Sequence, residues 1–592
     1  MSCDKLVYDL SQEVEGSPNV FVRKDWINIL DNQNQNYQNN QSIIDTSQLS
    51  NSNKYMAYRE AYLAIPMLLS MKTPVGVAVG ALPLNDYSIG LKNWFGSIIH
   101  SLTLDYNGTT IIQQTPFCNM WNIFKLITSL SYNDLKTQGC TIGFYPDTSG
   151  SWAYWNAASG NGTSVCNNDM GAIDVITSNY ITNNYTQFSA NTGGNIGMTY
   201  RTKWIAYNPA SGVNASSGVN SLAYENIGPN GANCSQIWKS YISTQVAVNN
   251  GVSGMVQYSI MGTIYLKHLH SFFNMCPLLK GVFMKITMNL NNSTSQITVA
   301  GAGAGGATTL GAFTSTSSIG GCVPILIPSV RTGSNFLTQV NMPNGQYFYD
   351  LTVGANSYNN NITGGTPGYQ PGQVSRSIYL YVPAYTFNPS FETAYLSNNI
   401  KQIKYTDIYQ YQVQGIGGAG AGGVGAQNQF NNLVSNGISN IKSVLIIPFL
   451  ANNPATGNAY AEYQSPFDTA GCGTTAPMVT LGNFNIQISG QNAIYNTQRY
   501  TFEEWNNQLY GQNAVNGGLT DGLTSGLIDF SDFQNAYCYY YVNVERMLPV
   551  EQSVPKAVQI YGQNYSQVPI NLWVFIEYGV EVHIDVLTGA RV

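Results

Sequence analysis

The chain has 592 residues, enough to bury a large core and, on length alone, to form several domains. Hydrophobic residues make up 44% and charged residues only 9%, against roughly 25% charged in typical soluble domains, so the composition excludes a disordered chain and predicts a surface of neutral polar groups. A net charge of −6 provides no basic field for nucleic acid, which argues against sequence-specific binding of DNA or RNA.

The N-terminal residues 1–20 are predicted to form a mobile arm. The start of the chain carries charge where a secretory signal would be apolar, and no apolar run reaches the roughly 18 residues that a membrane span needs. The nine cysteines are scattered and form no C-x-x-C pair. We therefore expect most of them to be reduced, small hydrophobic residues of a protein made in the cytosol.

The next segments have the pattern of strands. Residues 21–30 predict a strand, and the apolar run 62–69 a second one, which its single proline should place at a sheet edge or at a bend. Residues 102–121 predict a strand, a tight turn at Asn107-Gly108, a short strand and the start of a helix. Asn-Gly between two β-rich runs is the strongest short-range hairpin signal.

The same order of features returns later in the chain. Asp25 and Pro66, within the first two strands, each have a counterpart 382 residues further on, in the predicted strands 403–413 and 444–450. The hairpin also returns, with Leu102 matching a position 384 residues later, so that its second turn is expected at 491–492. Three features that recur in the same order, at nearly the same distance along the sequence, predict a tandem duplication.

The two copies differ in length. The first closes with the predicted strand 377–385 and the second with 571–578, which lie only 194 residues apart, so the first copy must carry about 190 additional residues. Two stretches rich in Gly, Asn, Ser and Thr supply them, at about 138–251 and 291–373. We interpret both as large loop insertions.

Between the insertions, 256–266 and 281–290 alternate apolar and polar residues with the period of half-buried strands. Helical patterns are few and cover 118–131, 389–398 and 502–509. The predicted fold is all-β, with two tandem eight-stranded antiparallel jelly rolls, few short helices and large loop insertions in the first. The predicted domains are an arm (1–20), a first jelly roll (21–386), a linker helix (387–402), and a second jelly roll with the C-terminal tail (403–592).

Candidate chemistry is sparse. Of four histidines only His268 and His270 are close in sequence, and on a strand they would share one face, so a metal site completed by Cys276 is geometrically conceivable. We favour a structural pair of polar histidines, because no Asp or Glu lies nearby. The sequence therefore predicts no catalytic residues, no cofactor-binding residues and no metal ligands.

Other conspicuous groups also have structural interpretations. Asp521, Asp529 and Glu503-Glu504 are expected in solvated loops and at helix N-termini. The glycine-rich tracts 301–306 and 417–422 lack the Lys-Ser/Thr that would hold a phosphate, and are interpreted as flexible loops. The aromatic cluster 537–542 is expected in the core or an interface, since no basic groove accompanies it. We expect the chain not to be an enzyme and to use no cofactor.

Three segments carry a family resemblance: 102–108 with the helix at Trp121, 269–281 leading into a strand, and 383–389 leading into the linker helix. Together with the duplication they resemble the double jelly-roll major capsid proteins of icosahedral double-stranded DNA viruses, with details closest to the virophage (Sputnik-like) group. The resemblance spans roughly Phe21 to Tyr578. The glycine-alanine loops and the size of the 138–251 insertion match no family pattern that we can identify.

The resemblance implies a homotrimer, a capsomer of near-hexagonal outline that tiles an icosahedral virion shell. It also implies assembly in the host cytoplasm and, as partners, neighbouring capsomers, penton and minor capsid proteins and any internal membrane. A duplicated domain independently suits such assembly, since threefold symmetry then presents six similar edges. The insertions would form an outward tower. No small-molecule substrate is expected; the alternative is a lectin-like or adhesion β-sandwich.

Overall fold

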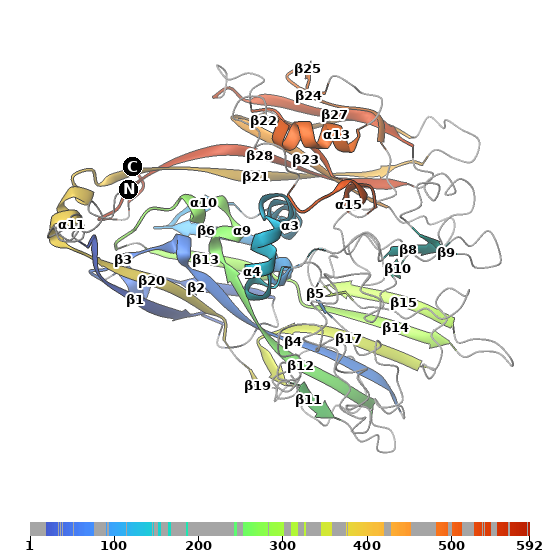
Figure 1. Cartoon of the computed structure of the whole chain (residues 1–592), viewed down its shortest axis with the longest axis horizontal. Helices are drawn as coiled ribbons and strands as arrows, with labels where there is room; N and C mark the ends of the chain where they lie inside the picture. Colours follow the sequence, from blue (N-terminus) through green and yellow to red (C-terminus); the bar gives the residue numbers. More distant parts are fainter. Residues whose placement is uncertain are drawn as a thin grey trace, which may run out of the picture.

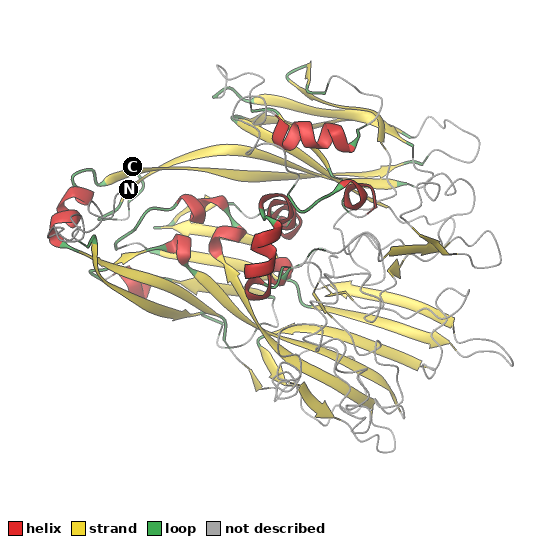
Figure 2. Cartoon of the chain, viewed as in Figure 1, coloured by secondary structure: helices red, strands yellow, loops and turns green. Residues whose placement is uncertain are grey.

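The computed structural model describes residues 19–75, 90–146, 152–155, 164–166, 185–186, 242–245, 253–300, 309–317, 325–326, 345–357, 374–418, 428–450, 481–494, 500–511, 526–545 and 553–592, apart from short gaps within these ranges. Strands dominate this part of the chain, and the helices lie mainly between the strand layers and at one end (Figure 2). Residues 1–18 of the predicted arm, Asp521 and most of the 138–251 insertion lie outside the described residues.

The second half of the chain forms two four-stranded antiparallel sheets. One has the order β21 (Ile400–Ile416), β28 (Ile570–Asp585), β23 (Ile441–Leu450) and β26 (Tyr540–Asn543). The other has the order β22 (Gln429–Ile438), β27 (Lys556–Asn564), β24 (Leu481–Ile488) and β25 (Gln491–Asn492). Eight consecutive strands paired in this way have the connectivity of a jelly roll.

The first half repeats this order of pairing. One sheet contains β1 (Phe21–Leu30), β20 (Tyr379–Phe387), β4 (Tyr62–Val75) and β12 (Ser253–Tyr265), and the other contains β2 (Gln41–Asp45), β13 (Met284–Leu290), β6 (Ile99–Tyr106) and β7 (Thr109–Ile112). Strand for strand, this is the order of the second half. The predicted all-β fold of two tandem jelly rolls is confirmed, while the exact domain boundaries stay predictions.

The 291–373 insertion is more than loops. It supplies β14 (Ser293–Ala300), β15 (Thr309–Ser317) and β17 (Gly345–Val353), which extend the first sheet because β17 pairs with the far half of β4. Shorter strands β3 (Tyr55–Met56) and β11 (Ile242–Gln245) join the same sheet at β20 and β12. The sequence did not predict these strands, because their Gly, Ser and Thr content is typical of loops.

Pro66 also departs from its prediction. Its strand, β4, is central to the sheet, with β12 on one side and β20 followed by β17 on the other. The Pro66 carbonyl accepts a hydrogen bond from the Gly354 N–H (2.8 Å), on the side where the neighbouring strand changes from β20 to β17. The missing proline N–H therefore falls where the ladder is already interrupted, so no edge position is needed.

The predicted hairpin turn is confirmed in the first jelly roll, where Asn107 and Gly108 have φ of 46° and 79°. Its counterpart was misplaced by the sequence. The second turn is Ser489-Gly490, with φ of 49° and 84°, and not 491–492, which form β25. The true offset is 382 residues, the same as for Asp25 and Pro66, so one offset relates all three features.

Gly108 offers a direct test of this turn. Replacing Gly108 with alanine should destabilise the chain by about 1–2 kcal/mol, because the left-handed backbone disfavours a Cβ although none of the described atoms lies close to where it would stand. Gly437→Ala is the matched control, since Gly437 has open space and no positive φ. Urea unfolding monitored by tryptophan fluorescence should show the loss for Gly108 alone; equal losses would contradict a type I′ turn.

The helices are short. The predicted helix 118–131 is α3 (Cys118–Ser129), followed by an unpredicted α4 (Tyr132–Ile142) with a capping box between Ser131 and Asp134. The predicted linker helix is α11 (Pro389–Leu396), where the Asn388 side chain accepts the Ser390 N–H. The third is α13 (Phe502–Asn506), followed by a π-helical turn. Among the described helices, none is long and apolar enough to cross a membrane.

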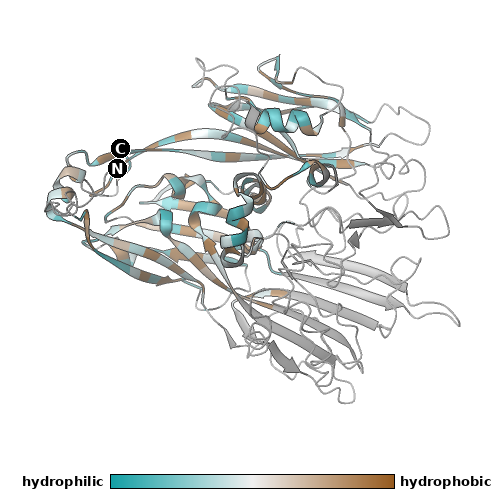
Figure 3. Cartoon of the chain, viewed as in Figure 1, coloured by the Kyte–Doolittle hydropathy of each residue, from teal (hydrophilic) through white to brown (hydrophobic). Residues whose placement is uncertain are grey.

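The core follows from strand periodicity. Buried and partly exposed residues alternate along β13 and β27, as predicted for the segment 281–290, and Figure 3 shows the alternation of hydrophobic and hydrophilic bands. Each apolar side chain buried in this way contributes about 1.5–3 kcal/mol. Tyr537, Tyr539, Tyr540, Tyr541 and Val542 are all buried, which confirms the prediction that this cluster belongs to the core or an interface.

Candidate functional site

The two jelly rolls meet where α3 and α10 (Ser271–Met275) of the first lie against β21 and β28 of the second (Figure 1). We call this contact the inter-unit interface. Three alternate residues of β28 face three residues that are spaced by four at the N-cap of α3 and within α3. The pairs are Phe117 with Trp573 (5.8 Å between rings), Trp121 with Phe575 (6.2 Å) and Lys125 Nζ with Glu577 Oε1 (3.1 Å).

The match has a geometric cause. Four residues of helix advance about 6 Å and two residues of strand about 6.6 Å, so the two spacings stay in step over three positions. At the end of this row, Phe124 reaches deeper and packs on three aromatic rings of the second jelly roll. Its partners are Trp505 (6.0 Å), Tyr539 (5.2 Å) and Tyr541 (5.5 Å).

Hydroxyl groups of the first jelly roll also cover the backbone edge of β21. Ser271 Oγ donates to the Thr406 carbonyl (2.6 Å) and accepts from the Thr406 N–H (2.9 Å). Thr115 Oγ1 donates to the Ile408 carbonyl (3.0 Å). An open strand edge invites pairing with other chains, and these side chains satisfy it within the chain.

Ser271→Ala should therefore loosen this edge. Loss of the hydroxyl leaves the Thr406 backbone without these partners in a partly buried site, which costs about 1–3 kcal/mol. Hydrogen–deuterium exchange of peptides covering β21 should become faster. The control Ser435→Ala removes only an exposed hydroxyl that accepts the Gly437 N–H. Unchanged exchange in β21 would show that Ser271 does not protect this edge.

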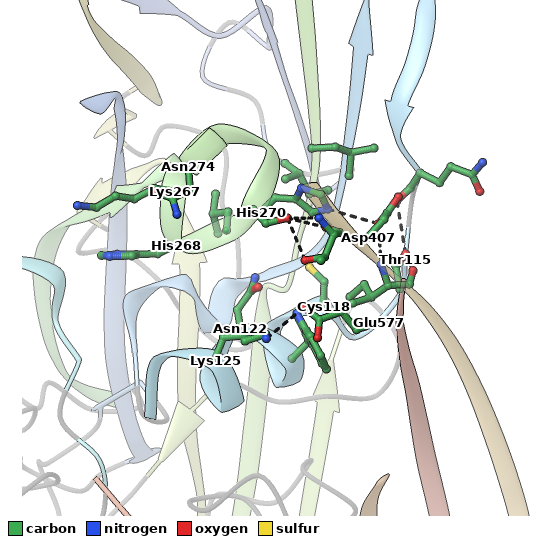
Figure 4. A pocket seen from close by; sticks show the side chains of 18 of the residues that line it. Thr115, Cys118, Asn122, Lys125, Lys267, His268, His270, Asn274, Asp407 and Glu577 are labelled. Atoms are coloured by element: carbon green, nitrogen blue, oxygen red, sulfur yellow. Dashed lines mark hydrogen bonds and ion pairs between the residues drawn. The ribbon is translucent and has the colours of Figure 1, made fainter. Parts of the chain in front are cut away.

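The conceivable metal site assumed that His268 and His270 share one face of a strand. Neither histidine lies on a strand. Residues 266–275 form two short helices, with His268 inside α9 (Leu266–Leu269) and His270 capping α10. His268 and His270 therefore point in different directions, and only His270 faces Asp407 (Figure 4). The apolar residues around the histidines fit a strand or a helix equally well, which explains the error.

His270 links the two jelly rolls. Its Nδ1 accepts the Phe272 N–H (3.2 Å), so Nε2 carries the proton of the neutral ring and donates to Asp407 Oδ1 (3.3 Å). With both ring nitrogens engaged, no lone pair is left to take a proton from Ser271, although serine, histidine and aspartate lie together here. The arrangement is suited to holding the interface and not to activating a nucleophile.

A cavity of about 280 Å³ lies at the inter-unit interface. Its polar lining includes Lys125, His268, Asn274, Asp407 and Glu577 (Figure 4). Burial, and to a lesser degree the charge of Lys267, lowers the pKa of His268 to about 4, so this ring is neutral near pH 7. Burial also raises the pKa of Cys118, in the same wall, to about 12, which leaves the thiol protonated and unreactive.

Glu577 is a buried carboxylate in the wall of this cavity. Burial alone would raise the pKa of Glu577, but the charge of Lys125 and hydrogen bonds from Ser443, Lys125 and Thr406 outweigh burial and hold the pKa below its usual value. The Ser443 hydroxyl donates to Glu577 Oε2 at 2.7 Å. A carboxylate paired and hydrogen-bonded in this way is compatible with a largely buried position.

The other predicted groups lie elsewhere. Glu503 and Glu504 are in the first turn of α13, where the Thr501 hydroxyl accepts the Glu504 N–H, and Asp529 accepts the Asp532 N–H (2.7 Å) at the start of α15 (Phe530–Asn535). Both agree with the prediction of helix N-terminal charge. Within the described ranges, no three His, Cys, Asp or Glu side chains are grouped so as to hold a metal ion.

The interface residues Thr115 and Ser271 were not predicted. Each binds the backbone of a residue far away in sequence, and a hydroxyl that contacts backbone has no sequence pattern of its own. Their positions gave the only signal: Ser271 lies within the segment 269–281 that carried the resemblance, and Thr115 lies between residues 102–108 and the helix at Trp121.

Comparison with known proteins gives matches only among solved structures. No family model matches the chain, and no curated protein matches it. The chain is similar to the Sputnik virophage structure (10% identity, 97% of this chain and 88% of that one, TM-score 0.47) and to the mavirus major capsid protein (10%, 98% and 92%, 0.45). It is also similar to the Faustovirus major capsid protein (10%, 98% and 94%, 0.39). The resemblance noted in the sequence is thus found among solved structures, whereas the fold is defined by the strand order described above.

Proposed function

We propose that this chain is a structural major capsid protein that forms trimeric capsomers of pseudo-hexameric outline and assembles them into an icosahedral virion shell. One observation carries the proposal: both halves of the chain have the same eight-strand jelly-roll order, and the first half already covers a face of the second. Three copies then present six similar units around one axis, and closed cyclic symmetry favours such assembly.

The remaining expectations belong to this proposal. The first jelly roll (21–386) would carry its insertions outward, the arm (1–20) would face the interior, and the linker helix (387–402) would join it to the second jelly roll (403–592). Neighbouring capsomers, penton and minor capsid proteins would be the partners, with assembly in the host cytoplasm. The role is structural, because the groups at the inter-unit interface bind one another and offer no activated nucleophile.

Purified full-length protein tests the proposal. Light scattering after size-exclusion chromatography should give three times the chain mass of 64.5 kDa, and negative-stain images should show particles of hexagonal outline that form shells at high concentration. A monomer that never assembles would contradict the proposal. If that monomer bound sugars on a glycan array, the alternative of a lectin-like or adhesion sandwich would replace it.

A further inference from the structure

The outer face of the first jelly roll carries connected aromatic side chains. They come from the four strands β1, β20, β4 and β12, and we call them the aromatic face: Trp26, Tyr62, Tyr265, Tyr379 and Tyr381. Tyr62 is central, stacked on Tyr381 (5.0 Å) and 5.7 Å from both Trp26 and Tyr265. None of the five is buried, and Trp26 is 50% exposed.

Apolar residues continue this face at its rim. Val22, Leu30 and Met261 are exposed by 68%, 51% and 44%. The strand that carries two of them, β1, is the edge of its sheet and pairs only with β20 among the described residues. Exposed aromatic and apolar side chains beside an open strand edge indicate a protein contact surface, because both features favour association with another chain.

The duplication shows what this face corresponds to. Tyr379 and Tyr381 of β20 stand 194 residues before Trp573 and Phe575 of β28, and both pairs face away from the core of their own jelly roll. Tyr381 lies opposite Tyr62 in the first jelly roll and Phe575 opposite Leu445 in the second. Leu445 stands 383 residues after Tyr62, so these neighbours match in position across the strands with an offset one residue larger than 382. In the second jelly roll this face is covered by α3, and Phe575 is 0% exposed.

The strand edges correspond as well. Lys24 and Trp26 of β1 stand 382 residues before Thr406 and Ile408 of β21. At those two positions of β21, hydroxyls of the first jelly roll satisfy the backbone. The first jelly roll thus covers both a face and an edge of the second, while its own matching face and edge have no such cover from the described part of the chain.

We propose that the aromatic face and the edge of β1 are the contact surface for a second copy of this chain. The second jelly roll of that copy lies on the first jelly roll of this one, as the first lies on the second within a chain. The contact joins two different surfaces, so it is heterologous. A heterologous contact that repeats with the same rotation around one axis closes into a ring. This inference rests on the proposed function and names the surface that function would use.

The double variant Trp26→Glu/Met261→Glu tests the surface. Both side chains are well exposed in the single chain, so the fold should be kept, while two carboxylates would be buried in the contact. The midpoint of trimer dissociation on dilution should move to a concentration at least about 30-fold higher, as for loss of one interface hot spot. The control Leu433→Glu changes a 54% exposed residue on β22 of the second jelly roll and should leave the dissociation midpoint unchanged.

A second measurement needs no variant. In wild-type protein, peptides covering β1 and β20 should exchange hydrogen more slowly at high than at low protein concentration, beyond any change in β22. If the wild type is a trimer but the double variant is equally so and β1 shows no such protection, the inference is wrong and the proposed function stands. If the wild type is a monomer at every concentration, the proposed function fails and this inference with it.

Discussion

Phe124→Ala is expected to lower the free energy of unfolding by about 3–5 kcal/mol, the usual cost of removing a buried aromatic ring. Phe124 is 1% exposed and belongs to the first jelly roll, but its ring contacts Trp505, Tyr539 and Tyr541 of the second. These rings are themselves held by their own strands and helix, so they cannot collapse into the space left behind. The cavity should therefore persist and the inter-unit interface should weaken.

Urea unfolding followed by tryptophan fluorescence measures this effect, because Trp505 and Trp121 report on the interface itself. The matched control is Tyr132→Ala in the adjacent helix α4, where the ring is 66% exposed and the loss should stay within about 0.5 kcal/mol. A loss for Phe124 no larger than that of the control would mean that α3 does not hold the jelly rolls together.

Lys125→Met is expected to cost about 2–3 kcal/mol at pH 7. The substitution leaves Glu577, whose side chain is 9% exposed, without its cationic partner. Breaking a fully buried pair costs about 3–5 kcal/mol, and the estimate is lower here because Lys125 itself is 43% exposed. Lys136→Met is the control, since the ammonium of Lys136 lies over the exposed ring of Tyr132.

The effect has a defined pH dependence. In the wild type the pKa of Glu577 lies below the ordinary glutamate value of 4.5, so its contribution to stability is complete above about pH 4.5 and is lost as the pH falls through the lowered pKa. Without Lys125, burial dominates and the pKa should rise above 4.5, so the difference between variant and wild type should shrink from neutral pH toward pH 4. Melting temperatures between pH 3 and 7 measure this. A difference that is constant over this range would contradict the ion pair.

Local patterns were sufficient to predict most of the framework. The alternation in β13 and the paired turn residues Asn107 and Gly108 depend on neighbours in sequence, and the duplication could be found because such local features repeat. The second turn was misplaced by two residues because Leu102 was matched to Ile486, 384 residues later, whereas the turns themselves are related by an offset of 382.

Features that depend on distant partners were not predicted. Pro66 can be central only because two different strands meet beside it, and β14, β15 and β17 form because β4 extends past the jelly roll to receive them. Likewise, nothing around His270 indicates that Asp407, 137 residues away, will lie opposite its ring. Tertiary pairing of this kind overrides local propensity and leaves no trace in a single sequence.

In the proposed capsomer, the contact between the first and second jelly rolls of one chain is repeated between neighbouring chains. A cryo-EM reconstruction of the purified full-length protein tests it most directly. We expect a threefold particle with six jelly rolls in a ring, in which the aromatic face around Tyr62 is covered by the second jelly roll of the neighbouring copy. A monomer, a twofold dimer, or a ring in which that face lies open to solvent would contradict it.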